Sequence, residues 1–313
     1  MPDRSVAPSR TWHGLAPILM ANGTLLFFYA AGAGLASPAA TIVACAAMLL
    51  FGLPHGTLDL EVLKTQLRAG SPRMAAVLLL YLVLAGGTYL LWQAAPVAAL
   101  ALFLVTAVVH FAEDWNDAGS AFFAQGLSVA LLSAPALLHL ADMKSLFVAL
   151  SGRPEGAVLG DVMLLLAPVS LAVAAVALLA FWQTGRRDRA GVGIAVLVGM
   201  VLLPPAVGFA SFFCLYHSPR HFRAALAGLS VDQFRRRWRY VVPLTLAAFG
   251  IAAWLFVGEA RGGISAQAVA ASFMTLSILT VPHMLVPEIV GLFPSQPRRV
   301  RAKGGSTVGL AID

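Results

Sequence analysis

Apolar residues occur along this chain in long, nearly uninterrupted stretches, and short polar segments separate one stretch from the next. A run of about 18 or more apolar residues is long enough to cross a bilayer as a helix. We therefore predict an all-α fold, a polytopic membrane bundle of about 8–10 helices with one helix re-entrant or broken. The predicted spans are 15–36, 38–56, 74–94, 96–113, 121–142, 157–182, 191–216, 240–258 and 267–292.

Composition supports the membrane class. Of the 313 residues, 59% are hydrophobic and only 11% are charged, whereas a soluble domain carries about 25% charged residues. We expect residues 1–313 to form a single transmembrane domain with short tails at about 1–14 and 294–313, because no polar segment is large enough for a separate domain. The net charge of +7 comes from basic residues in short loops, so nucleic-acid binding is not expected.

The basic loops predict a multi-pass protein of the cell inner membrane with both termini in the cytoplasm. Arg4, Arg10 and the basic residues of the next loops alternate across the spans as the positive-inside rule requires. The arginines that follow residue 216 break this alternation by one crossing. The simplest explanation of this break is that residues 191–216 do not form a single membrane crossing, because Pro204 and Pro205 interrupt the helix. An undetected extra crossing would explain the break equally well.

Five histidines lie in short polar segments at the ends of apolar stretches, where a polar group is costly unless it has a function. They are His55, His110, His217, His221 and His283. His55 and Asp59 are four residues apart, and so are His110 and Asp114, which places each pair on one face of a helix. A metal-bound imidazole commonly donates its second N–H to a carboxylate. Helix capping would explain one such pair, but the recurrence favours a metal site.

His217 and His221 show the same spacing, with Pro219 between them. We expect Ser218 to be the N-cap of a new helix and Pro219 its first residue, where a missing N–H costs nothing. The two imidazoles are then expected to converge with the other histidines near the cytoplasmic side. Four imidazoles suit Fe, Zn, Cu or Ni, and the residues do not choose among these metals.

Other function classes can be weighed from the same residues. The lysines are Lys64, Lys144 and Lys303, all in loops or the tail, so the Schiff base of an opsin is excluded. A His-Glu-x-x-His protease motif is absent. Two alternatives stay open: a membrane transporter or metal permease that uses the histidines as a pathway, and a membrane protein that binds an apolar ligand without catalysis.

In these short polar segments the chain resembles the Brp/Blh family of β-carotene 15,15′-dioxygenases. The motifs that carry the resemblance are Pro54-His55-Gly56-x-x-Asp59, His110-Phe111-x-x-Asp114, His217-Ser218-Pro219-Arg220-His221 and Pro282-His283-Met284. They occur in the family's order between residues 52 and 284, and the four together are specific although each alone is weak.

The resemblance implies a non-haem iron enzyme that cleaves the central double bond of β-carotene with O2 to give two all-trans-retinal molecules. It implies Fe(2+) held by His55, His110, His217 and His221, which are also the catalytic residues. We expect membrane lipids around the enzyme and a rhodopsin as a recipient of the retinal, and the non-catalytic alternative is then a carotenoid-binding membrane protein. The expected supporting or pocket residues are Asp59, Asp114, Glu113, His283 and Tyr216. Phe111, Phe212, Phe213, Trp115 and Tyr216 are expected tunnel aromatics, although ordinary helix packing would explain each of them.

Overall fold

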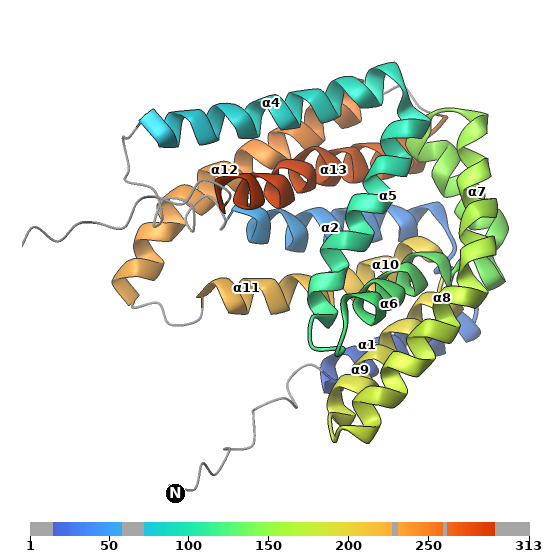
Figure 1. The fold of residues 1–313 in the computed structure, drawn as a ribbon. Helices are drawn as coiled ribbons and strands as arrows, with labels where there is room; N and C mark the ends of the chain where they lie inside the picture. The colour runs from blue at the N-terminus through green and yellow to red at the C-terminus, as the bar shows by residue number, and fades with distance from the viewer. Residues whose placement is uncertain (1–14, 58–71, 227–230, 259–261, 292–313) are drawn as a thin grey trace, which may run out of the picture.

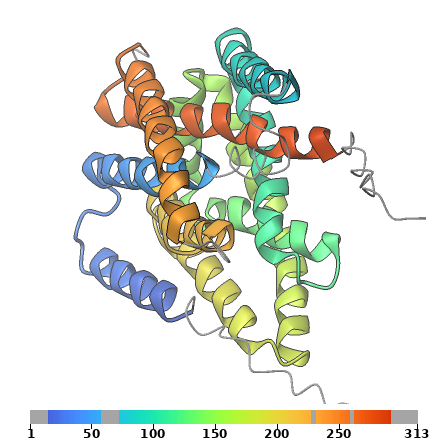
Figure 2. The same ribbon diagram turned by 90° about the vertical axis from the view of Figure 1, so that its left-hand side faces the viewer.

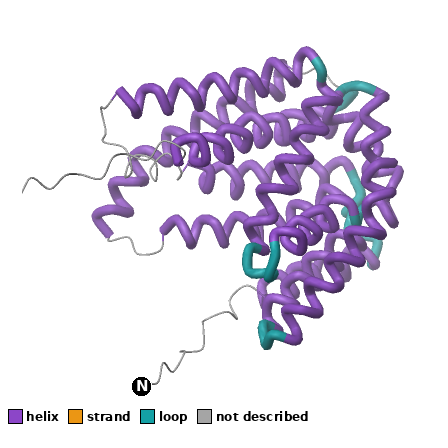
Figure 3. The backbone as a smooth tube through the Cα atoms, viewed as in Figure 1, coloured by secondary structure: helices purple, strands orange, loops and turns teal. Residues whose placement is uncertain are grey.

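A computed structural model describes residues 15–57, 72–226, 231–258 and 262–291, and within these ranges the regular structure is entirely helical (Figure 3). Asp59 and both predicted tails lie outside the described residues, and of His55 only the backbone is described. The helices are α1 Leu15–Ala30, α2 Pro38–Thr57, α4 Pro72–Ala94, α5 Pro96–Ala112, α6 Ala121–Ser133, α7 Ala136–Ser151, α8 Val158–Gln183, α9 Arg187–Leu202, α10 Pro205–Phe212, α11 Ser218–Leu226, α12 Val231–Gly258 and α13 Ile264–Gly291, with short helices η1 Glu113–Trp115, η2 Pro154–Ala157 and the π-helix η3 Phe213–His217.

The predicted polytopic membrane bundle is confirmed. Within the described residues, five helices are long and apolar enough to cross a membrane, and the bent pair α6–α7 brings the number to six. The helices α1 and α2 contain shorter apolar segments. Large apolar side chains cover the outside of the bundle, as a hydrocarbon environment requires, since lipid tails solvate them as well as a protein core does.

Two predicted spans are broken by proline. The break expected in 191–216 is confirmed: α9 ends at Leu202, Leu203 is extended, and α10 begins at Pro205. The helix α10 folds back on α9 so closely that a β-carbon on Gly208 would lie 3.1 Å from the carbonyl oxygen of Gly199. The span predicted at 121–142 is not one straight helix, because the chain bends by 69° between α6 and α7, where Pro135 has no N–H for a helical hydrogen bond.

The helix α13 is the centre of one half of the bundle. It contacts α2, α4 and α12, and 72% of its apolar segment is buried, against 17% for α4 and 22% for α12. Figures 1 and 2 show the second half, in which α6, α7, α8 and α9 pack against one another. The oblique helix α5 runs between the halves and contacts α4, α6, α7 and α13, so its carboxyl end lies inside the molecule.

Candidate active site

The carboxyl end of α5 places two polar side chains deep in the bundle. Pro96 starts this helix at a position where its missing N–H is tolerated, and an apolar sequence continues to His110 and Ala112. The tight turn η1 then turns Asp114 inward, so that His110 is 4% exposed and Asp114 is completely buried. The chain leaves through Gly119, whose φ of +86° favours glycine.

A π-helix carries the second part of the site. In η3 the Ser218 N–H bonds to the Phe213 carbonyl, five residues back, and His217 is fully buried. The expected N-cap at Ser218 is wrong: its φ of −60° and ψ of −45° are helical, whereas an N-cap is extended. The chain instead passes from α10 through η3 into α11 without a cap. A single π-turn admits one extra residue into a helix, and such turns are frequent at functional sites.

Four imidazoles from three segments meet in one cluster, in which His217, His221 and His283 surround the ring of His110. The centroid of the His110 ring lies 4.8 Å from the ring centroid of His217, 5.6 Å from that of His221 and 5.1 Å from that of His283. The ring centroids of His217 and His221 are 4.5 Å apart. Residues separated by 173 positions along the chain, from 110 to 283, therefore share one cluster. The sequence had paired His217 with His221 and predicted that both converge with His110, whereas His283 was expected only as a supporting or pocket residue.

The Asp114 carboxylate pairs with histidines of another segment. Its Oδ2 lies 2.7 Å from Nδ1 of His217, and its Oδ1 lies 3.4 Å from Nε2 of His221 and 3.5 Å from Nε of Arg220. A carboxylate with no solvent exposure is tolerated only with such partners, because an unpaired buried charge costs several kcal/mol. Asp114 therefore links η1 to η3 and α11.

The donor set fits a transition metal. One candidate ligand atom from each of Asp114, His217 and His221 lies within 4.8 Å of the others. Imidazole nitrogen and carboxylate oxygen are ligands that non-haem iron, zinc and copper accept. Because Nδ1 of His217 lies against Asp114, Nε2 is the atom through which this imidazole would hold a metal, which is the usual carboxylate–histidine–metal arrangement.

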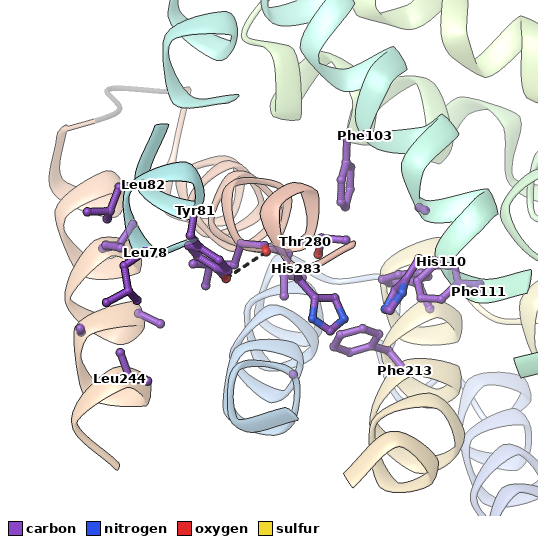
Figure 4. Close-up of a pocket in the computed structure, with 18 residues that line it drawn as sticks. Leu78, Tyr81, Leu82, Phe103, His110, Phe111, Phe213, Leu244, Thr280 and His283 are labelled. Carbon is purple, nitrogen blue, oxygen red and sulfur yellow. Dashed lines mark hydrogen bonds between the residues drawn. The ribbon is translucent and has the colours of Figure 1, made fainter. Parts of the chain in front are cut away.

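An apolar cavity of about 360 Å³ opens beside the histidines. Figure 4 shows His110, Phe111, Phe213 and His283 at one end, and Leu78, Leu82 and Leu244 at the other. Among the described residues that line it, the polar side chains are those of Tyr81, Thr280 and the two histidines. The cavity is therefore suited to a long hydrocarbon whose reactive part must reach the histidine cluster.

The sequence did not indicate Arg189, which joins η1 to η3. Its guanidinium donates two hydrogen bonds to the Asp117 carboxylate, at 2.8 and 3.0 Å, and others to the Asp114 carbonyl and the Tyr216 hydroxyl. Trp115 stacks on Tyr216, with ring centroids 5.6 Å apart, beneath the same cation. Partial burial would raise the pKa of Asp117, but the hydrogen bonds and charge of Arg189 outweigh it and hold that pKa below its ordinary value.

Comparison with known proteins shows the family to which this chain belongs. A family model described as "Beta-carotene 15,15'-dioxygenase" matches residues 46–290. The chain belongs to this family. It is 28% identical to the "Beta-carotene 15,15'-dioxygenase" of uncultured marine bacterium 66A03 over 275 residues, 83% of this chain and 96% of that relative. It is 26% identical over 287 residues, 77% of this chain and 81% of the relative, to the "Probable beta-carotene 15,15'-dioxygenase Blh" of Halobacterium salinarum. No solved structure matches the chain.

In this member of the dioxygenase family, the remaining predicted residues lie in different places. His55 lies in the last turn of α2, beyond Gly52, which packs against Phe213 of η3, so this turn of the helix is close to the cluster. Glu113 is half exposed, with Oε1 4.0 Å from Nδ1 of His110. His283 lines the cavity, next to His110.

The predicted aromatics divide into two groups. Phe111 and Phe213 line the cavity, and Phe213 also stacks on His217, with ring centroids 5.3 Å apart. Tyr216, Trp115 and Phe212 pack around the cluster on other sides and are not among the cavity-lining residues. A position near a histidine in the sequence does not show whether a side chain is on the helix face that lines the cavity. The π-turn also changes which residues share a face, because it adds one residue to the helical turn.

Proposed function

We propose that this chain cleaves β-carotene at the central 15,15′ double bond with O2 and releases two all-trans-retinal molecules. The observation that carries the proposal is the contact between a buried histidine–carboxylate cluster and an apolar cavity. Membership of the dioxygenase family supports the substrate and the reaction. A polar substrate would leave its own groups unpaired in such a cavity.

We infer that a single Fe(2+) is held by His55, His110, His217 and His221. Three of these imidazoles meet at centroid distances of 4.5 to 5.6 Å, and the backbone of His55 belongs to the last turn of α2. When bound, the iron supplies the redox chemistry that lets O2 react with the electron-rich polyene. The family expectation, rather than the donor atoms alone, selects iron over zinc or copper.

The protein's own groups have positioning roles in this proposal. Asp114 holds His217 in one tautomer and one ring orientation through the 2.7 Å contact at Nδ1. Phe111 and Phe213 keep the polyene side of the cluster dry, because their rings line the cavity beside His110 and His283. We assign His283 to the cavity wall. Tyr216 supports η3 through Arg189, and Glu113 and Asp59 remain candidate acceptors for metal-bound imidazoles.

We further propose an inner-membrane location with both termini cytoplasmic, with β-carotene drawn from surrounding lipid and retinal available to a rhodopsin. The apolar helices support the membrane setting, and the basic loops support the orientation. A permease that used the histidines as a pathway would carry flux without forming a product, and a non-catalytic binding protein would retain unchanged carotene.

The test is expression in a bacterium that makes β-carotene, with pigments separated by chromatography. Wild type should convert carotene to retinal, whereas His55→Ala, His110→Ala, His217→Ala and His221→Ala should each abolish the conversion and reduce iron retention. His139→Ala is the matched control, since His139 contacts Asp142 on α7 rather than the cluster. Full activity in any one of the four variants would remove that residue from the ligand set.

A further inference from the structure

The cavity beside the histidines extends to the outside of the bundle. At its inner end, His110, Phe111 and Phe213 are each less than 6% exposed. At its outer end, Leu78 is 42% exposed and Leu82 is 68% exposed. The same cavity therefore joins fully buried side chains to side chains on the surface.

Two helices border the outer end. Leu78 and Leu82 belong to α4, and Leu244 and Ala247, which is exposed, belong to α12. Both helices pack on α13, whose residues Leu276 and Thr280 form the floor between them. Figure 4 shows Leu78, Leu82 and Leu244 together, away from His110 and Phe213.

The surface at this opening is apolar. The rim residues of α4 and α12 are leucine and alanine, and only 17% of the apolar segment of α4 and 22% of that of α12 are buried. Within a membrane, such an outward face contacts acyl chains, not water. A hydrocarbon dissolved in the bilayer can pass an apolar rim without losing hydrogen bonds, whereas passage through water would expose its entire surface.

The floor of the opening is held by a polar contact. Tyr81 of α4 donates a hydrogen bond of 3.3 Å to the carbonyl oxygen of Leu279 on α13, and both residues line the cavity. This contact joins α4 to the floor on the inner side of the Leu78 and Leu82 rim. An entering molecule would therefore pass between the α4 rim and α12 and then alongside Tyr81.

We propose that the space between α4 and α12 is a lateral portal through which the long apolar substrate enters the cavity directly from the bilayer. Leu82 and Ala247 are the rim residues that control access. The proposal rests on the proposed function for the identity of the substrate, a carotene. It assigns to these residues a role in substrate entry that is separate from metal binding.

The experiment narrows the portal and compares each narrowed variant with a neighbour on the same helix. Leu82→Trp and Ala247→Trp add a large ring at the rim. Leu79→Trp and Ala253→Trp are matched controls, because Leu79 is 62% exposed and Ala253 is exposed, yet neither lines the cavity. The proteins are placed in vesicles with increasing mole fractions of β-carotene, and the initial rate and the iron content are measured.

Both rim variants should lower the catalytic efficiency by about tenfold or more, the factor that corresponds to about 1.4 kcal/mol of obstruction, with unchanged iron content. Both controls should match wild type. A second measurement omits oxygen and determines the β-carotene that co-purifies with each protein, which should fall in the rim variants alone. Rim variants that match their controls in both measurements would overturn the portal. Wild-type protein that binds carotene but never cleaves it would refute the proposed function and leave the portal standing.

Discussion

At the scale of single residues, Asp114 links more of the site than any position suggested by spacing alone. The sequence placed it four residues after His110, as an expected partner on the same helix face. In the fold its carboxylate lies 2.7 Å from His217 and 3.4 Å from His221, which belong to another segment. Arg189 of α9 donates a hydrogen bond to the backbone carbonyl of Asp114. Asp114 is therefore held both by α9 and by the histidines of η3 and α11.

The role of Asp114 can be tested by Asp114→Asn, which keeps the shape and removes the charge. We expect a loss of about 10–100-fold in metal affinity, because an outer carboxylate fixes the tautomer and basicity of the ligand that it contacts. The measurement is iron retained per chain against a graded series of chelator concentrations. Asp142→Asn is the control, because this exposed carboxylate contacts His139 on α7 rather than the cluster; equal losses in the two variants would contradict the assignment.

At the scale of helices, the breaks matter more to the site than the spans. Most span boundaries were predicted within a few residues, because long apolar runs leave little choice in a bilayer. Pro204 correctly indicated a broken helix. The sequence did not predict the π-turn at Phe213–His217 or the bend at Pro135. A proline in or near an apolar run indicates a change in the helix, but the sequence alone does not distinguish a kink, a new helix start and a π-turn.

Close packing between α2 and η3 gives a test at this scale. A β-carbon on Gly52 would lie 2.4 Å from the Phe213 ring, which itself stacks on His217. Gly52→Ala should therefore displace that ring, cost about 1–3 kcal/mol of stability and lower activity. The control is Gly86→Ala on α4, because a β-carbon at Gly86 would have no atom within 4 Å. This variant should leave the stability and the activity unchanged. Thermal unfolding in detergent and the cleavage rate measure the two effects, and wild-type behaviour of Gly52→Ala would show that this contact is not critical.

At the scale of the whole molecule, the fold brings together residues that no local pattern connects. Spacing identified His110, His217 and His221 as candidate ligands, but it could not show that His283 of α13 lies 5.1 Å from His110. It could not predict the cavity either, because α4, α5, α10, α12 and α13 all contribute to its walls. The oblique path of α5 between the two halves of the bundle places the cluster at the inner end of that cavity (Figure 1).

We propose that this chain cuts β-carotene symmetrically at the histidine cluster. The most direct measurement is the molar yield of products from purified, iron-loaded protein supplied with β-carotene and O2, separated by chromatography. We expect about two retinal molecules for each β-carotene consumed, since both halves of a centrally cut molecule are retinal. Unchanged β-carotene, or two apocarotenals of unequal length, would contradict it.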